Sequence, residues 1–341
     1  MTHHSLSSLG ERALIRRITT RLAASLPRRP WVHVGPGDDA AVLAPERGAY
    51  DVLTTDAVVD GVHFDRTFVP LEAVGHRALA VNLSDLAAMG AHPRAALLSF
   101  VLPESLDAVE IDRLLDGLLP LASAHGVAIV GGNITRTTGP LVIDVTAIGT
   151  ARPRTVLTRD GARPGDEVYV TGSLGAAAVG LQMLRTTPGV GHSSPVVAES
   201  CVGRYLRPIP RVRVGTLLGR TRAATSCMDL SDGLADAASQ VAEASGVGMR
   251  LEADALPVAA GVREWQVAHG GDLLETVTAG GDDYELLFTV RPSHRGRLRA
   301  VRTRIGDLPI TRIGTVTRGR EVVLATGTGL RELSAGFDHF R

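Results

Sequence analysis

Two stretches of sequence, Gly37-Asp38-Asp39-Ala40-Ala41-Val42-Leu43 and Leu53-Thr54-Thr55-Asp56, decide the first half of the chain. In the first, two carboxylates follow a Gly-Pro-Gly turn and precede a short apolar run. In the second, an apolar run ends in two hydroxyls and a carboxylate. We expect strands at residues 40–43 and 51–55, joined as a hairpin through a turn at 45–48. Asp56 would then follow the end of a strand, where α/β proteins bind their ligands.

Two further acidic motifs lie far downstream, Asp229-Leu230-Ser231-Asp232-Gly233 and Gly280-Gly281-Asp282-Asp283-Tyr284-Glu285. Each has an ordinary explanation when taken singly. Asp beside Gly favours turns, and Ser231 or Asp232 suits the N-cap of a helix expected at 234–245. Together the motifs spread carboxylates over both halves of the chain. Because Mg²⁺ is bound by a few carboxylates plus substrate phosphates, the pattern indicates metal-assisted phosphate chemistry.

Composition excludes several other classes of protein. A chain of 341 residues is long enough for two domains. Zero formal net charge argues against binding to nucleic acid or to an anionic membrane. The two cysteines, Cys201 and Cys227, do not make a disulfide framework, so a reducing cytoplasm is expected. No apolar run approaches the length of a membrane span.

The sequence contains no lysine, so its 36 basic residues are all arginine. A Walker-type phosphate loop and a protein-kinase site both require a lysine. If the protein transfers phosphate, metal ions, backbone N–H groups and arginine must hold the phosphates.

Apolar periodicity and breaker residues predict alternating helices and strands, which indicates an α/β or α+β protein. The halves meet near Arg152-Pro153-Arg154, which divides the chain into domains at 1–150 and 151–341. The expected helices are 6–26, 71–89, 107–125, 211–218 and 234–245. The further expected strands are 95–102, 127–130, 141–148, 167–170, 249–252, 286–290, 310–316 and 321–324.

Four single positions add weaker signals. Asp85 interrupts an apolar helix, although a solvated helix face is the plainer reading. Gly132 and its neighbour Gly131 follow a short apolar strand, where backbone can approach a ligand or simply turn. Arg159 lies between the halves and could clamp a phosphate. His63 could contact a substrate phosphate, although a lone histidine is more often structural.

These motifs resemble the thiamine-monophosphate kinase family, collinearly from residue 9 to the end of the chain. The matching segments are Gly-Asp-Asp-Ala-Ala-Val-Leu (37–43), Thr-Thr-Asp (54–56), Gly-Val-His-Phe (61–64), Ala-Val-Asn-Leu-Ser-Asp-Leu-Ala-Ala-Met-Gly-Ala-His-Pro (80–93), Leu-Thr-Arg-Asp-Gly-Ala-Arg-Pro-Gly-Asp (157–166), Arg-Tyr-Leu-Arg-Pro (204–208), Asp-Leu-Ser-Asp-Gly-Leu (229–234), Gly-Gly-Asp-Asp-Tyr-Glu-Leu (280–286) and Gly-Phe-Asp-His-Phe (336–340). The segment at 80–91 is the most specific of them.

The resemblance implies ATP-dependent phosphorylation of thiamine monophosphate to thiamine diphosphate. It also implies the two-domain fold of the aminoimidazole-ribonucleotide synthetase superfamily. In that fold the N-terminal domain dimerises through its sheet to form a homodimer, ATP lies near the dimer interface, and the C-terminal α/β domain closes the cleft.

The resemblance also assigns residues by position, with no protein nucleophile. Mg²⁺ ligands would be Asp39, Thr54, Thr55, Asp56, Asp85, Asn133, Asp229 and Asp232. ATP contacts would be Gly132, Asn133, Arg159 and Ser231. Thiamine monophosphate would meet His63, Asp282 and Phe337, with Phe337 against an aromatic ring of the substrate.

Two positions depart from the family pattern. Asn133 stands where the family usually has Asp after two glycines, so an oxygen ligand remains but a charge is lost. Asp282 stands where Glu is common, which shortens the side chain by one methylene. Two alternatives therefore stay open: an ATP-dependent synthetase of the same superfamily, and a non-catalytic ATP-binding sensor.

Overall fold

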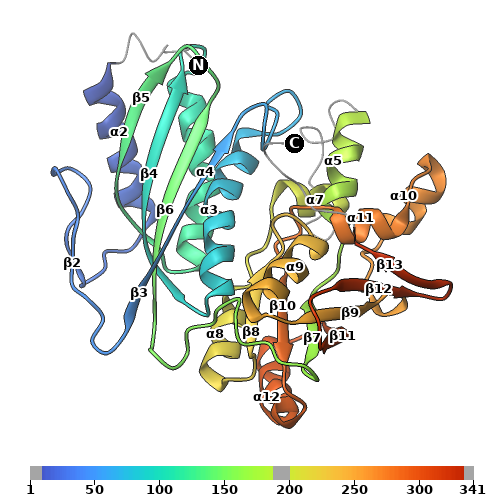
Figure 1. The fold of residues 1–341 in the computed structure, drawn as a ribbon. Coiled ribbons are helices and arrows are strands. Elements are labelled where there is room, and N and C mark those ends of the chain that lie inside the picture. The colour runs from blue at the N-terminus through green and yellow to red at the C-terminus, as the bar shows by residue number, and fades with distance from the viewer. Residues whose placement is uncertain (1–9, 187–199, 334–341) are drawn as a thin grey trace.

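The structure, a computed structural model, describes residues 10–186 and 200–333. Figure 1 shows two sheets with helices packed between and around them. Helix α3 (Leu71–Ala88) runs beside the four-stranded sheet of the first half and reaches the second half. Within the described residues, no helix is both long and apolar enough to cross a membrane.

The first half is a four-stranded sheet in the order β3-β6-β4-β5. All its pairings are antiparallel except β4 with β5. Its strands are β3 (Tyr50–Val59), β4 (His92–Pro103), β5 (Ala128–Thr137) and β6 (Val142–Ala151). Its helices besides α3 are α2 (Glu11–Ser25) and α4 (Ala108–Ala124). A separate ribbon of β1 (Val32–Val34) and β2 (Val42–Leu43) packs Trp31 and Leu43 against Ala95 and Ala128 of the sheet.

The second half is a seven-stranded mixed sheet in the order β13-β12-β9-β11-β7-β10-β8. Its strands are β7 (Glu167–Thr171), β8 (Ser226–Asp229), β9 (Gly248–Glu252), β10 (Leu286–Val290), β11 (Ile310–Thr317), β12 (Val322–Thr326) and β13 (Gly329–Glu332). Its α-helices are α5 (Ala176–Thr186), α7 (Cys201–Leu206), α8 (Val212–Thr221), α9 (Leu234–Ser245), α10 (Val262–His269), α11 (Leu273–Ala279) and α12 (Arg295–Ile305).

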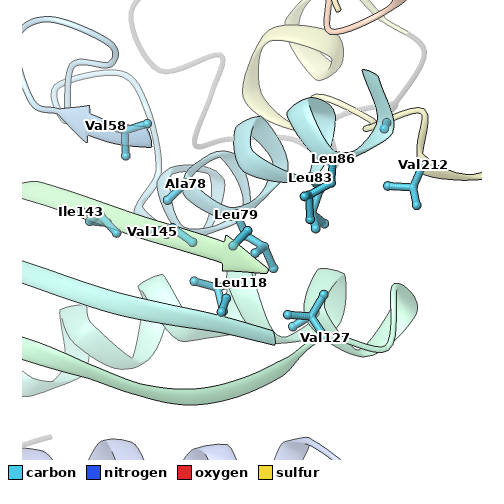
Figure 2. Close-up of a cluster of buried hydrophobic side chains, with 14 of the residues drawn as sticks. Val58, Ala78, Leu79, Leu83, Leu86, Leu118, Val127, Ile143, Val145 and Val212 are labelled. Carbon is cyan, nitrogen blue, oxygen red and sulfur yellow. The ribbon is translucent and has the colours of Figure 1, made fainter. Parts of the chain in front are cut away.

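Helix α3 is apolar on nearly every side because it is buried on nearly every side. Figure 2 shows Leu79 between the helix and Ile143 and Val145 of β6, with Leu118 of α4 below it, and Val212 of α8 beyond Leu83 and Leu86 in the same apolar cluster. Each fully buried leucine of this kind contributes about 1.5–3 kcal/mol. One apolar cluster joins residues of both halves around α3, so the halves share a core and α3 can bring residues of both together.

Most of the predicted elements are confirmed, including the helices at 71–89 and 107–125 and the strands of the second half. Asp107 is the N-cap of α4, accepting hydrogen bonds from the backbone N–H groups of Val109 and Glu110. Residues before 10 lie outside the described range, so only 11–25 of the first predicted helix can be compared. Both cysteines are free and buried.

The predicted hairpin between 40–43 and 51–55 is wrong. β2 pairs with β1, while β3 pairs along its whole length with β6, about ninety residues away in the chain. The turn sequence at 45–48 reflects only local preferences. Which strand β3 pairs with is decided instead by the burial of its apolar face in the packed sheet. β3 also continues to Val59, so Asp56 lies inside a strand rather than at its end.

The strand predicted at 127–130 is also longer than expected. β5 runs through Gly131, Gly132 and Asn133, which therefore lie in a ladder with β4 and not in a turn. Glycine usually weakens a strand, but at Gly132 it lets the backbone of β5 lie close to the backbone of β4. A Cβ atom on Gly132 would lie 1.9 Å from the carbonyl oxygen of Leu98.

Candidate active site

Three acidic side chains from three elements meet where the two halves join. Thr54 and Asp56 lie on one face of β3, because their partners in β6 are the buried Ala147 and Val145, although Asp56 itself is exposed. The alternation of side chains along a strand turns both toward α3. Thr54 Oγ1 donates a hydrogen bond of 2.5 Å to Asp85 Oδ2 of α3. The structure thus brings Thr54, Asp56 and Asp85 together.

The second half contributes Asp229, which ends β8 and is 4% exposed. Ser84 of α3, one residue before Asp85, donates a hydrogen bond of 2.6 Å to Asp229 Oδ2. Asp232 follows in the loop before α9 and interacts electrostatically with Asp56. Gly233, with no side-chain cap, is the N-cap of α9, so the capping explanation for Ser231 and Asp232 is wrong.

These carboxylates repel one another. Burial and the neighbouring Asp85 raise the pKa of Asp56 from 3.8 to about 7. Burial and Asp85 likewise raise the pKa of Asp229 to about 7, against the hydrogen bond from Ser84. Burial also raises the pKa of Asp85, although Thr54 and the charge of Arg159 act in the opposite direction. We call Asp56, Asp85, Asp229 and Asp232 the acidic cluster; burial disfavours the charged form of three of its members, Asp56, Asp85 and Asp229.

The donor chemistry of the acidic cluster fits a hard divalent cation. Carboxylate and hydroxyl oxygens are the ligands that Mg²⁺ prefers, and Mg²⁺ usually retains waters and substrate phosphates as further ligands. Within the described residues, no group of three or more acidic, histidine or cysteine side chains is placed so that it could hold a metal ion by itself. This arrangement suits a metal that bridges protein and substrate better than one enclosed by protein alone.

The opposite face of the first sheet carries other predicted residues. Thr55 alternates with Thr54 and Asp56, and its Oγ1 donates a hydrogen bond of 2.9 Å to Asp144 Oδ1 on that face. Asn133 of β5 pairs with Ser99 of β4, and its side chain donates a hydrogen bond of 3.0 Å to Thr135 Oγ1. The structure therefore does not bring Thr55 or Asn133 to the acidic cluster of the same chain.

The remaining predicted residues of the first half are more scattered. Asp39 is exposed between β1 and β2. Gly132 lies in β5, which is the edge strand of the first sheet farthest from β3 and its Thr54 and Asp56. Arg159 acts electrostatically on Asp85 and donates a hydrogen bond to Gln240 of α9. His63 Nδ1 accepts a hydrogen bond of 3.1 Å from the backbone N–H of Val59, within the turn that follows β3.

The loop with the last acidic motif packs directly on the loop after β8. The backbone N–H of Asp282 donates to the carbonyl of Ser231 at 2.7 Å, and that of Tyr284 donates to the carbonyl of Leu230 at 3.0 Å. Gly281 permits this contact, because its Cβ would lie 2.7 Å from the Ser231 carbonyl oxygen. The two downstream motifs thus form one surface. Phe337 lies outside the described residues.

Sequence reasoning missed two charged residues next to these positions. Arg77 of α3 forms an ion pair with Asp282, and Asp144 of β6 accepts the hydrogen bond from Thr55. An arginine among the apolar residues of α3 was a usable signal, because a buried charge in a helix needs a partner. Asp144 gave no signal, since alternating polar residues are ordinary on an open sheet face.

Comparisons with known proteins agree with this architecture. The N-terminal domain model of AIR synthase related proteins matches residues 37–151, and the C-terminal domain model matches residues 163–326. The thiamine-monophosphate kinase of Salmonella typhimurium is 36% identical over 334 residues, covering 97% of this chain and 98% of that protein.

Solved structures agree as well. The crystal structure of thiamine-monophosphate kinase from Stenotrophomonas maltophilia is 36% identical, with a TM-score of 0.80 over 90% of this chain and 95% of that chain. The structure of AaThiL complexed with AMPPCP and TMP is 30% identical, with a TM-score of 0.75 over the full length of both chains. The two-domain aminoimidazole-ribonucleotide synthetase-like fold is thus confirmed, and this chain belongs to the thiamine-monophosphate kinase family.

Proposed function

We propose that this protein catalyses ATP-dependent phosphorylation of thiamine monophosphate to thiamine diphosphate, the final step of thiamine diphosphate biosynthesis. Family membership supports the substrates, and the acidic cluster between the two domains is the observation that carries the chemistry. Two phosphate groups must approach each other for the transfer, and carboxylates alone would repel both. The site therefore requires a cation that the protein does not itself supply.

Mg²⁺ would neutralise the phosphates when bound. The acidic cluster and Thr54 would hold it, and we propose Asp39, Thr55 and Asn133, which lie away from that cluster in the same chain, as further Mg²⁺ ligands. The phosphoryl group passes through a loose transition state, so positioning and electrostatics can supply the catalysis. No side chain of the protein needs to act as a nucleophile, and transfer is in line. Ser84 and Thr54 orient Asp229 and Asp85 by hydrogen bonds.

For the two substrates we propose separate sets of residues. Gly132, Asn133, Arg159 and Ser231 would contact ATP. His63, Asp282 and Phe337 would contact thiamine monophosphate. In this division, residues 1–150 form the ATP, Mg²⁺ and dimerisation domain, and residues 151–341 complete the active site. We place the protein in the cytoplasm, a reducing compartment in which unpaired thiols such as Cys201 and Cys227 persist.

We further propose a homodimer in which the open face of the four-stranded sheet of one subunit packs against the same face of its partner. Leu53 lies on that face beside Thr55 and is 65% exposed, which is unusual for a leucine in a long strand. We expect Leu53→Arg to convert a dimer to a monomer in light scattering. A wild-type protein that is monomeric at micromolar concentration would contradict this.

The reaction itself is tested by incubating the purified protein with Mg²⁺, ATP and thiamine monophosphate. Chromatography should show thiamine diphosphate, with ADP formed in equal amount, only when all three are present. No product, with ATP binding retained in calorimetry, would refute the proposal and favour an ATP-binding sensor. Asn133, which replaces the usual carboxylate, is the feature that makes this outcome worth testing.

A further inference from the structure

Arg77 is a buried arginine of α3 that the metal and phosphate chemistry above does not use. It is 3% exposed and lies two turns before Asp85, on the side of α3 that meets the second domain. A guanidinium stays charged in a protein, and burying an unpaired charge is costly. Its partners should therefore reveal what it does.

The charge partner is Asp282, which we assign to the substrate. Arg77 forms an ion pair with Asp282 Oδ1. The hydroxyl of Tyr284 donates a longer hydrogen bond, of 3.3 Å, to the same oxygen. Among the described residues, Asp282 Oδ2 has no partner, and the side chain keeps 30% of its surface exposed. One carboxylate oxygen is thus anchored and the other remains available.

The backbone of this loop needs such an anchor. Asp282 has φ +70° and Tyr284 has φ +49°. Residues other than glycine rarely adopt this left-handed region, and they do so only where the surroundings hold them. The hydrogen bonds from the backbone N–H groups of both residues to the loop after β8 fix the main chain. Arg77 is the side-chain contact that fixes the carboxylate.

Arg77 also connects to the other substrate residue, His63. Its Nη1 donates a hydrogen bond of 2.9 Å to the carbonyl of Tyr205, and its guanidinium carbon lies 4.8 Å from the centre of the Tyr205 ring. The hydroxyl of Tyr205 donates to the carbonyl of His63 at 3.4 Å. One guanidinium therefore touches both the residue that holds the His63 turn and the carboxylate of Asp282.

We propose that Arg77 is a positioning residue for thiamine monophosphate, which acts by holding Oδ1 of Asp282 so that Oδ2 is preset for the substrate. This inference rests on the proposed function, in which Asp282 contacts that substrate. Because Arg77 belongs to the N-terminal domain and Asp282 to the C-terminal domain, recognition of the phosphate acceptor depends on the junction between them.

Steady-state kinetics of Arg77→Met test the proposal. We expect the KM for thiamine monophosphate to rise ~10-fold, the effect of losing one charge-assisted contact. The KM for ATP and kcat should stay within about 2-fold, because the acidic cluster is not touched. Arg77→Lys should recover part of the loss, since lysine keeps the charge but not the two-nitrogen fork.

A double mutant separates positioning from general support of the fold. If Arg77 acts through Asp282, adding Arg77→Met to Asp282→Asn should raise the KM for thiamine monophosphate no further than Asp282→Asn does alone. Arg113→Met is the matched control, because Arg113 pairs with Glu72 of α3 away from this loop, and its KM values should match those of the wild type. Additive effects, or equal increases in both KM values, would overturn the proposal.

Tyr284→Phe keeps the test decisive if Arg77→Met does not fold. It removes only the hydroxyl that reaches Asp282 Oδ1, and we expect a smaller rise in the same KM, with none for ATP. Unchanged kinetics in this variant and in Arg77→Lys would overturn the proposal. The wild-type assay settles the proposed function separately, because thiamine diphosphate formed by the wild type supports that function whatever the variants do.

Discussion

Asp229 and Glu285 are neighbouring buried carboxylates with opposite electrostatics. They lie beside each other at the junction of β8 and β10, where the backbone N–H of Leu230 donates to the carbonyl of Glu285 at 2.9 Å. Asp229 is 4% exposed and faces other carboxylates, so its pKa is raised to about 7. Glu285 is fully buried too, but the guanidiniums of Arg211 and Arg204 outweigh burial and lower its pKa.

The difference separates a structural ion pair from a binding site. Glu285 accepts hydrogen bonds from Arg211, Arg204 and Thr171, all within its own domain. Its charge is satisfied without a ligand. Asp229 has a hydroxyl donor, Ser84, but no arginine partner among residues 10–186 and 200–333. Its negative charge would therefore be stabilised by a bound cation. A buried carboxylate without a counter-charge is a mark of a functional site, and variants of Glu285 and Asp229 should separate the two cases.

The largest expected effect is the loss of stability in Glu285→Gln. Removing one member of a buried ion pair leaves its partners uncompensated, here Arg204 and Arg211, and costs about 3–5 kcal/mol. Urea unfolding should show this decrease in the free energy of unfolding. The control Glu72→Gln breaks a partly exposed pair with Arg113 and should cost about 0–1 kcal/mol. Equal losses in the two variants would show that the Glu285 pair is not structural.

Asp229→Asn should lower activity without lowering stability. The amide oxygen can still accept the hydrogen bond from Ser84, but the negative charge is gone. We expect kcat/KM to fall ~10²–10³-fold, as when other preorganised electrostatic groups are removed. Stability at pH 8 without Mg²⁺ should not decrease, because a repelled charge has been removed. Asp254→Asn, in an exposed turn, serves as control, and a wild-type rate in Asp229→Asn would contradict the metal role.

The two kinds of carboxylate also predict how stability depends on pH. Asp56 and Asp229 have folded-state pKa values of about 7 against 3.8 unfolded, so the folded state holds more protons. Their contribution is complete below pH 3.8 and is lost as the pH rises through 7. Glu285, with a lowered pKa, contributes above pH 4.5 and loses its contribution as the pH falls below that. Without Mg²⁺ the protein should therefore be most stable near pH 5 and less stable at pH 8.

Mg²⁺ should reverse this decline at high pH. A ligand at 100 times its Kd stabilises the folded state by about 2.7 kcal/mol, and in the proposed site Mg²⁺ would bind the ionised carboxylates. Thermal unfolding with and without Mg²⁺ should show a larger increase in Tm at pH 8 than at pH 5. Asp283, whose pKa is raised to about 7 by burial, caps α5 rather than facing the cluster, so part of the decline should remain. An equal increase at both pH values would contradict a metal site built from raised-pKa carboxylates.

The comparison also shows what the sequence could and could not reveal. Asp85 was detectable because it interrupts the apolar pattern of α3, and the pattern itself located the helix. The contrast between Asp229 and Glu285 was not detectable, because both belong to acidic motifs beside a buried strand. What distinguishes them is Arg204 and Arg211, which are 81 and 74 residues from Glu285 in the chain. The partner of β3 was missed for the same reason, since pairing over such a separation is a property of the packed sheet.

The smallest expected effect is that of Asn133→Asp, which restores the usual family carboxylate on the open face of the sheet. Asn133 and Asp144 of β6 flank Ser99 of β4 in register, so the substitution places a second carboxylate two strands from the first, about 10 Å away. We expect the Mg²⁺ concentration for half-maximal activity to fall roughly 3–10-fold, which corresponds to about 0.7–1.4 kcal/mol. Titrating Mg²⁺ at saturating ATP measures this. An unchanged midpoint would show that position 133 does not ligate the metal in this protein, and would leave the acidic cluster as the metal site.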